Sequence, residues 1–383
     1  MSPEPVLKPL LSSPQPRIPV AAPVLDGRET EYVLECMQTT WISSVGRFIT
    51  AFEEGFAQLC GARHAIATNN GTTALHVALL AMGLKPGDEV IVPTLTYIAS
   101  ANAVRYCGAT PVFVDNDLHT FNVDPTSIAA AITPRTRAIM PVHLYGQPVD
   151  MDPILQLAQD NDLLILEDAA EAVGAQYKGR RTGTFGDCAS FSFFGNKILT
   201  TGEGGMVTTN DDAFAARLRL LRGQGMDPQR RYWFPEIGYN YRMTNIAAAI
   251  GLAQLERIDV HLRARQTIAN RYNERLKNLS DLIILPVSAP WAEHVYWMYT
   301  IMLRDEVKRT RDEIMAAMDL DGIETRPVFY PMHVLPPYKD DTPGKFPRAD
   351  FCSSRGINLP THGRLSDSDI DRVVSSLRSA LVR

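Results

Sequence analysis

From about residue 60 the chain alternates short apolar runs with longer amphipathic segments. The apolar runs lie at 64–70, 88–94, 110–115, 137–146, 163–168, 189–194 and 204–211. Amphipathic stretches that predict helices lie between them, at 74–84, 97–108, 151–162 and 211–223. Short apolar strands that alternate with helices predict βαβ units, so we expect an α/β fold with a mostly parallel sheet flanked by helices.

The pattern changes in the last third of the chain. A long helical run at 244–278 is followed by a strand-like run at 294–303, a helical stretch at 311–323 and a last helix after Leu365. This mixture predicts a second, smaller α+β domain. We therefore divide the chain into a flexible Pro-rich tail (1–17), a large domain (18–255) and a small C-terminal domain (256–383).

Composition narrows the function classes. The 383 residues are 45% hydrophobic and 21% charged, with a net charge of -5, as in ordinary globular proteins. No basic block predicts a nucleic-acid or membrane-surface partner, and no apolar run reaches spanning length. The five cysteines are scattered without a CxxC pair, which favours a reducing cytosol over a disulfide framework or a metal site.

The segment 69–84 predicts a strand that ends in a phosphate-binding turn. Gly71 permits close approach of the backbone, Thr72 adds a hydroxyl, and the following helix begins with unpaired N–H groups. Ordinary helix capping explains the same residues and stays open. The G-x-G-x-x-G spacing of dinucleotide-binding enzymes is absent.

Two acids follow the apolar strand 163–168. Asp168 ends the strand, where ligands of open α/β sheets gather, and Glu171 lies three residues further on. A helix cap or a structural ion pair remains an alternative for Asp168, and Glu171 could instead close a capping box. Tyr97 follows another strand, where its ring can cover a flat ligand or pack as a core residue.

Lys197 lies between aromatic residues and a glycine-rich turn, in the sequence FSFFGNKILTTGEGG (191–205). Most lysines are solvated, but this setting predicts a desolvated amine with a lowered pKa. Ser192 is placed to donate to a phosphate. A phosphate turn, a stacking aromatic, an acid and a lysine, all at strand ends, are what pyridoxal phosphate (PLP) requires, with the lysine as Schiff-base amine and the acid on the pyridine nitrogen.

This constellation resembles the sugar-nucleotide aminotransferases of the DegT/DnrJ/EryC1/StrS family. The pattern SF-x-x-x-K-x-x-x-x-GEGG (192–205) and the block GYNYRMTNIAAAIG (238–251) carry the resemblance. It implies the aspartate-aminotransferase fold (PLP fold type I), with Lys197 bonded to the cofactor. It further implies ring contacts from Asp168, Glu171 and Tyr97, phosphate contacts from Gly71, Thr72 and Ser192, and Asn240 on the phosphate of a neighbouring subunit in a homodimer or higher oligomer.

The segments TTWISSVGRFITAFE (39–53) and IETRPVFYPMHVLPPY (323–338) are similar to those of family members that act on GDP-4-keto-6-deoxy-D-mannose. That resemblance implies amination at C4 with L-glutamate as donor, for surface polysaccharides such as O-antigen. We consider His143, Arg326, Tyr330 and His333 as substrate contacts, against structural roles at strand ends and turns. Three alternative functions remain open: a 3- or 4-aminotransferase for dTDP- or UDP-sugars, a PLP-dependent sugar dehydratase, and a non-catalytic PLP-binding regulator.

Overall fold

Seven strands form the central sheet of the computed structural model, which describes residues 16–339 and 345–382. Of the expected flexible tail (1–17), all but Pro16 and Arg17 lies outside the described residues. The strand order is β1-β9-β8-β5-β4-β2-β3. The strands are β1 (His64–Thr68), β2 (Glu89–Pro93), β3 (Thr110–Val114), β4 (Thr136–Ile139), β5 (Leu164–Asp168), β8 (Cys188–Ser192) and β9 (Gly205–Thr209). Only β9 runs antiparallel to its neighbours, so the predicted mostly parallel sheet is confirmed.

Helices cover both faces of this sheet, which explains why most positions of its strands are buried. Along β2, Val90 and Val92 join one hydrophobic cluster, whereas Ile91 joins another that includes Ile128 and Ile154. The helices of this part are α1 (Glu29–Thr39), α2 (Arg47–Cys60), α3 (Gly71–Ala81), α4 (Ala99–Tyr106), α5 (Pro125–Ala131), α6 (Met151–Asp160), α7 (Asp212–Arg222) and the short η1 (Leu144–Gly146). The alternation of inward positions thus builds a three-layer α/β unit.

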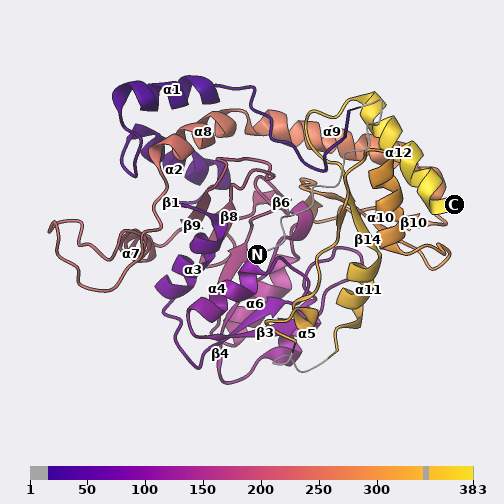
Figure 1. Cartoon of the computed structure of the whole chain (residues 1–383). Coiled ribbons are helices and arrows are strands. Elements are labelled where there is room, and N and C mark those ends of the chain that lie inside the picture. The colour runs from indigo at the N-terminus through magenta and orange to yellow at the C-terminus, as the bar shows by residue number, and fades with distance from the viewer. Residues whose placement is uncertain (1–15, 340–344, 383) are drawn as a thin grey trace, which may run out of the picture.

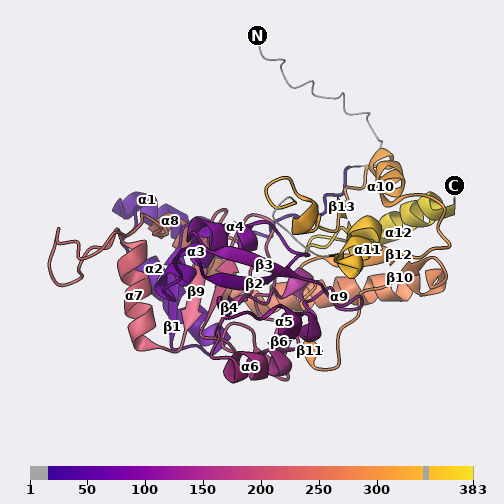
Figure 2. The same ribbon diagram turned by 90° about the horizontal axis from the view of Figure 1, so that it is seen from below.

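A second, four-stranded sheet lies beside the first, in the orange and yellow part of the chain in Figures 1 and 2. Its order is β10-β12-β14-β13. Its elements are β10 (Ile283–Ile284), β12 (Tyr299–Leu303), β13 (Arg326–Pro327), β14 (Gly356–Leu359), α10 (Arg311–Leu320), α11 (Pro347–Arg355), α12 (Asp367–Val382), η2 (Lys277–Leu279) and η3 (Met332–Val334). A small third sheet is formed by β11 (Ala292–Glu293), β6 (Gln176–Tyr177) and β7 (Arg180–Arg181).

Three features differ from the sequence prediction. The single helix expected at 244–278 is two helices, α8 (Asn245–Glu256) and α9 (Ile258–Leu276), because the backbone at Arg257 (φ -108, ψ 5) leaves the helical region. The strand expected at 294–303 begins only at Tyr299, since Tyr296 adopts a positive φ of 48. Helices α1 and α2 precede the region from which the alternation was read.

The fold places the carboxyl-terminal ends of several strands of the large sheet together, next to the second sheet. The residues that follow β1, β2, β5 and β8 therefore converge from distant parts of the sequence, as expected for parallel strands. Among the described residues, no helix combines the length and the apolar character needed to cross a bilayer.

Candidate active site

A cavity of about 590 Å³ opens between the edge of the large sheet and the second sheet. Eight residues singled out in the sequence line it: Gly71, Thr72, Tyr97, Asp168, Glu171, Ser192, Lys197 and Arg326. The second sheet contributes Arg326 and Asn358, and the segment that leads into its strand β12 contributes Trp297 and Met298. The cavity is therefore assembled from both parts of the chain.

The turn after β1 is shaped for an anion. Asn70 caps helix α3, because its side chain accepts from the N–H of Thr73 at 2.9 Å. The first N–H groups of the helix, on Gly71 and Thr72, have no acceptor in the preceding turn. A Cβ on Gly71 would lie 2.7 Å from the Cβ of Ser192, so only glycine allows this turn to approach the end of β8. In this turn the side chain of Asn70 caps the helix, while the N–H groups of Gly71 and Thr72 stay available to an anion.

Asp168 is buried at the end of β5 and faces the cavity. Its Oδ2 accepts from the hydroxyl of Ser100 at 2.7 Å, and its Oδ1 accepts from the N–H of Ala170 at 3.2 Å. Burial raises the pKa of this carboxyl, whereas the hydrogen bond from Ser100 opposes that change. Both hydrogen-bond donors are neutral, so the site leaves a buried acid open to a cationic group.

Lys197 lies in the turn between β8 and β9. Its side chain is only 12% exposed, and its Nζ lies 3.9 Å from Oε1 of Glu171. Burial lowers the pKa of the amine, while the carboxylates of Glu171 and Asp168 oppose this shift. Burial in turn raises the pKa of Glu171, whose other oxygen accepts from the N–H of Tyr145 at 2.7 Å. Burial thus favours the neutral form of the amine, which is the form that acts as a nucleophile or base.

Aromatic side chains wall the cavity. The rings of Trp297 and Phe329 both stack on Tyr145, with centroids 6.2 and 5.4 Å away. Tyr97 lies 5.8 Å from Phe329 and is 59% exposed, so its ring is available to cover a flat ligand at the mouth of the site. These rings exclude water from one side of the lysine.

Four other predicted site residues do not line this cavity. His143 is fully buried, where it accepts from the N–H of Val149 at 3.0 Å and pairs with Glu167 at 3.1 Å. His333 bridges Thr94 and Asp350. The other two are Tyr330, which lines a neighbouring cavity, and Asn240, which is exposed and is bridged to Gly223 at the end of α7.

Two functional candidates were missed in the sequence. Ser100, which donates to Asp168, lies three residues after Tyr97. A serine at this position is also typical of an ordinary helix start, so the sequence does not mark it as a site residue. Trp297 lies with its ring centroid 3.9 Å from Nζ of Lys197 and its Nε1 donates to the carbonyl of Asn196 at 2.9 Å. No local pattern distinguishes Trp297 from a core aromatic residue.

The residues fit PLP. The turn of α3 offers N–H groups for its phosphate, the partly exposed Tyr97 offers a stacking surface, and the buried Asp168 lacks the cation that a protonated pyridine nitrogen would supply. Lys197 provides an amine of lowered pKa in the same cavity.

Known proteins share this organisation over almost the whole chain. The model of the DegT/DnrJ/EryC1/StrS aminotransferase family matches residues 23–378. GDP-perosamine synthase of Caulobacter vibrioides is 63% identical over 96% of this chain and 99% of its own, and that of Escherichia coli O157:H7 is 49% identical over 94% and 97%. A putative sugar aminotransferase of Streptococcus pneumoniae in its PLP form is 28% identical, covers 95% of this chain and 98% of its own, and superposes with a TM-score of 0.90.

Proposed function

Because the chain belongs to the DegT/DnrJ/EryC1/StrS aminotransferase family, we propose that it transfers the amino group of L-glutamate to C4 of GDP-4-keto-6-deoxy-D-mannose. The products are GDP-perosamine and 2-oxoglutarate. The protein is a PLP-dependent aminotransferase with the fold of that class. The choice of nucleotide sugar rests on its relatives, two of which are named GDP-perosamine synthase at 63% and 49% identity.

The observation that carries the chemistry is the buried pair of Lys197 and Asp168 in one cavity. When bound, PLP stores the amino group between two half-reactions and withdraws electrons from the carbon that loses or gains a proton. Lys197 would hold the cofactor covalently through Nζ, Asp168 would keep its ring nitrogen protonated, and the α3 turn with Ser192 would hold its phosphate.

Lys197 is also the group that moves the proton. When the amine is not bonded to the cofactor, its lowered pKa increases the share of neutral amine, which can take a proton from the reacting carbon and return one to it in the reverse direction. The carboxylate of Glu171, whose Oε1 lies 3.9 Å from Nζ, then forms an ion pair with the resulting ammonium group. The ring of Trp297 faces the same Nζ and keeps it within the cavity.

The diphosphate of the substrate fits the side of the cavity formed by the second sheet. Arg326 lines this side with 42% of its side chain exposed, and its contact with Glu324 is a long one of 3.5 Å. A guanidinium that is weakly engaged and faces a cavity suits the diphosphate of a nucleotide sugar.

We also propose that the enzyme is a homodimer with shared active sites. The segment 224–240 projects from the molecule beside α7 (Figure 1) and exposes Tyr232, Trp233, Phe234 and Ile237. Large apolar side chains gathered on one projecting segment indicate a surface that another chain covers. Asn240, at the end of this segment, would then reach the phosphate site of the partner.

A cytoplasmic location and a role in surface polysaccharide synthesis, such as that of O-antigen, complete the proposal. All five cysteines are free and buried, which suits a reducing compartment. Three relatives named GDP-perosamine synthase support the proposed role in polysaccharide synthesis.

The decisive experiment incubates the PLP-loaded protein with L-glutamate and each of the GDP-, dTDP- and UDP-4-keto-6-deoxy sugars. Mass spectrometry should find a 4-amino sugar with the GDP substrate, together with 2-oxoglutarate. A deoxy-keto product would reveal a dehydratase, and amination of only the dTDP or UDP sugar would refute the proposed substrate.

A further inference from the structure

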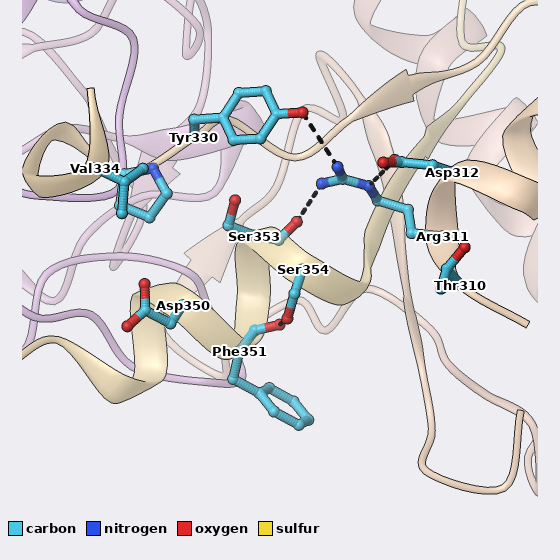
Figure 3. A pocket seen from close by; sticks show the side chains of 10 residues that line it. Thr310, Arg311, Asp312, Tyr330, Val334, Asp350, Phe351, Ser353 and Ser354 are labelled. Atoms are coloured by element: carbon cyan, nitrogen blue, oxygen red, sulfur yellow. Dashed lines mark hydrogen bonds and ion pairs between the residues drawn. The ribbon is translucent and has the colours of Figure 1, made fainter. Parts of the chain in front are cut away.

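A second cavity, of about 540 Å³, lies beside the catalytic one and is not used by the chemistry described above. Figure 3 shows it between the beginning of α10, the loop that follows β13 and helix α11. Its walls are formed by Thr310, Arg311, Asp312, Tyr330, Pro331, Val334, Asp350, Phe351, Ser353 and Ser354. It therefore combines aromatic and apolar surface with two carboxylates.

Tyr330 presents a fixed aromatic surface in this cavity. Its hydroxyl accepts from Nη2 of the buried Arg311 at 3.4 Å, while Nη1 of the same guanidinium donates to the carbonyl of Ser353 (Figure 3). Nε of Arg311 donates to Asp312 at 2.8 Å. Tyr330 nevertheless remains 52% exposed, so a planar group can stack on it.

Asp350 presents an oriented acceptor. Its Oδ1 pairs with Nε2 of His333 at 3.0 Å, and Nδ1 of that histidine contacts the hydroxyl of Thr94 at 2.8 Å. The side chain of Asp350 is 56% exposed, so it can accept hydrogen bonds from a ligand. Both acids have a partner, but Asp312 is paired with a permanently charged guanidinium and Asp350 with an imidazole, so Asp350 keeps more capacity to accept from a ligand.

The two cavities are neighbours along one short segment. Arg326 and Phe329 line the catalytic cavity, and Tyr330, the next residue, lines the second one. The four steps from Arg326 to Tyr330 span at most about 14 Å even when fully extended. A substrate whose reacting carbon lies at Lys197 can thus place its diphosphate near Arg326 and its far end in the second cavity.

We propose that this second cavity binds the guanine base of the nucleotide sugar, with Tyr330 stacked on the purine and Asp350 accepting from N1–H and the exocyclic amine. The inference rests on the proposed function and specifies how the base is selected. Guanine presents two adjacent donors on this edge, which match one carboxylate. Uracil and thymine present a single N–H between two carbonyl oxygens, and these oxygens would be repelled by Asp350.

The test measures binding of GDP and UDP to the PLP-loaded protein by calorimetry, for the unchanged chain and for Asp350→Asn. We expect the unchanged chain to prefer GDP and Asp350→Asn to lose about 10- to 100-fold in GDP affinity, with UDP affinity not reduced. Tyr330→Leu should weaken both nucleotides, because stacking is shared by both bases. The exposed Asp281→Asn, outside the cavity, serves as the matched control.

An internal control separates this loss from misfolding. The half-reaction with L-glutamate does not involve the base, so its rate, followed by the cofactor absorbance, should be the same in Asp350→Asn and the unchanged chain. This inference would be overturned if Asp350→Asn kept its normal preference for GDP and Tyr330→Leu kept its normal GDP affinity. If the unchanged chain still aminated the GDP sugar, the proposed function would nevertheless stand. Failure of the unchanged chain to aminate the GDP sugar would instead refute the function itself.

Discussion

The amine of Lys197 lies 3.9 Å from the ring centroid of Trp297, although the two residues are separated by 100 positions in the sequence and Trp297 lies just before β12 of the second sheet. The lysine is anchored in a turn of the large sheet. The contact therefore couples the reacting amine to the packing of the two parts of the chain. When the amine is protonated, its contact with this aromatic face in a desolvated site gains about 2 kcal/mol, enough to influence the position of the amine.

Replacing Trp297 should impair proton transfer according to how much aromatic surface remains. We expect Trp297→Leu to slow the glutamate half-reaction by about 10-fold, and Trp297→Phe to slow it less, because phenylalanine keeps an aromatic face. Single-turnover absorbance measurements give these rates. Equal losses in both variants would assign the role of Trp297 to its hydrogen bond with Asn196 instead.

Lys197 itself should be indispensable. Lys197→Ala removes the covalent link and the proton carrier, so turnover should fall by at least about 100-fold. Lys197→Arg keeps a positive charge but offers no usable amine, and it should be equally inactive. Borohydride reduction followed by peptide mass mapping should find the cofactor on residue 197 of the unchanged chain only. Native rates in Lys197→Ala would remove this residue from the mechanism.

Ser100 should act through Asp168. Its hydroxyl donates to the buried carboxylate at 2.7 Å and holds the pKa of Asp168 down against burial. Ser100→Ala should weaken PLP binding by about 10- to 100-fold, equivalent to about 1.5–3 kcal/mol for a hydrogen bond to a charged group.

Absorbance titration of the cofactor-free protein with PLP measures this affinity. Thr96→Val is a suitable comparison, because the hydroxyl of Thr96 lies 3.3 Å from that of Ser100 and is not bonded to the acid. A loss in Thr96→Val as large as in Ser100→Ala would indicate a general packing defect.

The pH dependence of cofactor capture should report the Lys197–Glu171 pair. Capture requires the neutral amine, so its rate should fall as the pH drops through the pKa of Lys197, which burial has lowered. The Glu171 carboxylate raises that pKa, so Glu171→Gln should move the acid limb of the profile to lower pH. Stopped-flow mixing of PLP with the cofactor-free protein measures the profile, and a shift to higher pH would contradict this electrostatic account.

Asn240 offers a test of shared active sites. Lys197→Ala and Asn240→Ala should each be poorly active alone. In a mixed dimer, one site receives Lys197 and Asn240 from different subunits and is complete, so an equal mixture that exchanges subunits should recover roughly a quarter of normal activity. Sites contained within one chain would show no recovery on mixing.

The sequence predicted the half of the site that belongs to the large sheet. Gly71 follows β1, whereas Asp168 and Ser192 are the last residues of β5 and β8, and parallel strands bring their carboxyl ends together whatever the loop details. Their contacts with PLP stay predictions, but their convergence is a feature of the fold. The glycine-rich turn around Lys197 was informative because few other structures need that composition.

The site residues that do not lie at the carboxyl ends of these strands could not be predicted from the strand pattern. Trp297 and Phe329 reach the cavity only through the packing of the second part of the chain, and local patterns do not encode that packing. His143 follows a strand like the other residues, but its burial and its partners Glu167 and Val149 were decided by tertiary contacts. Likewise, no Gly or Pro at Arg257 signalled the break between α8 and α9.

The turn that carries Lys197 is fastened at both of its ends. Phe193 donates its N–H to the carbonyl of Gly204 and accepts from the N–H of Thr201, and Phe194 and Gly202 are bridged. These hydrogen bonds tie the backbone on either side of the lysine to the sheet. We therefore expect the amine to move by rotation about its own four-carbon side chain, and substrates of different size to be accommodated at the opposite wall of the cavity.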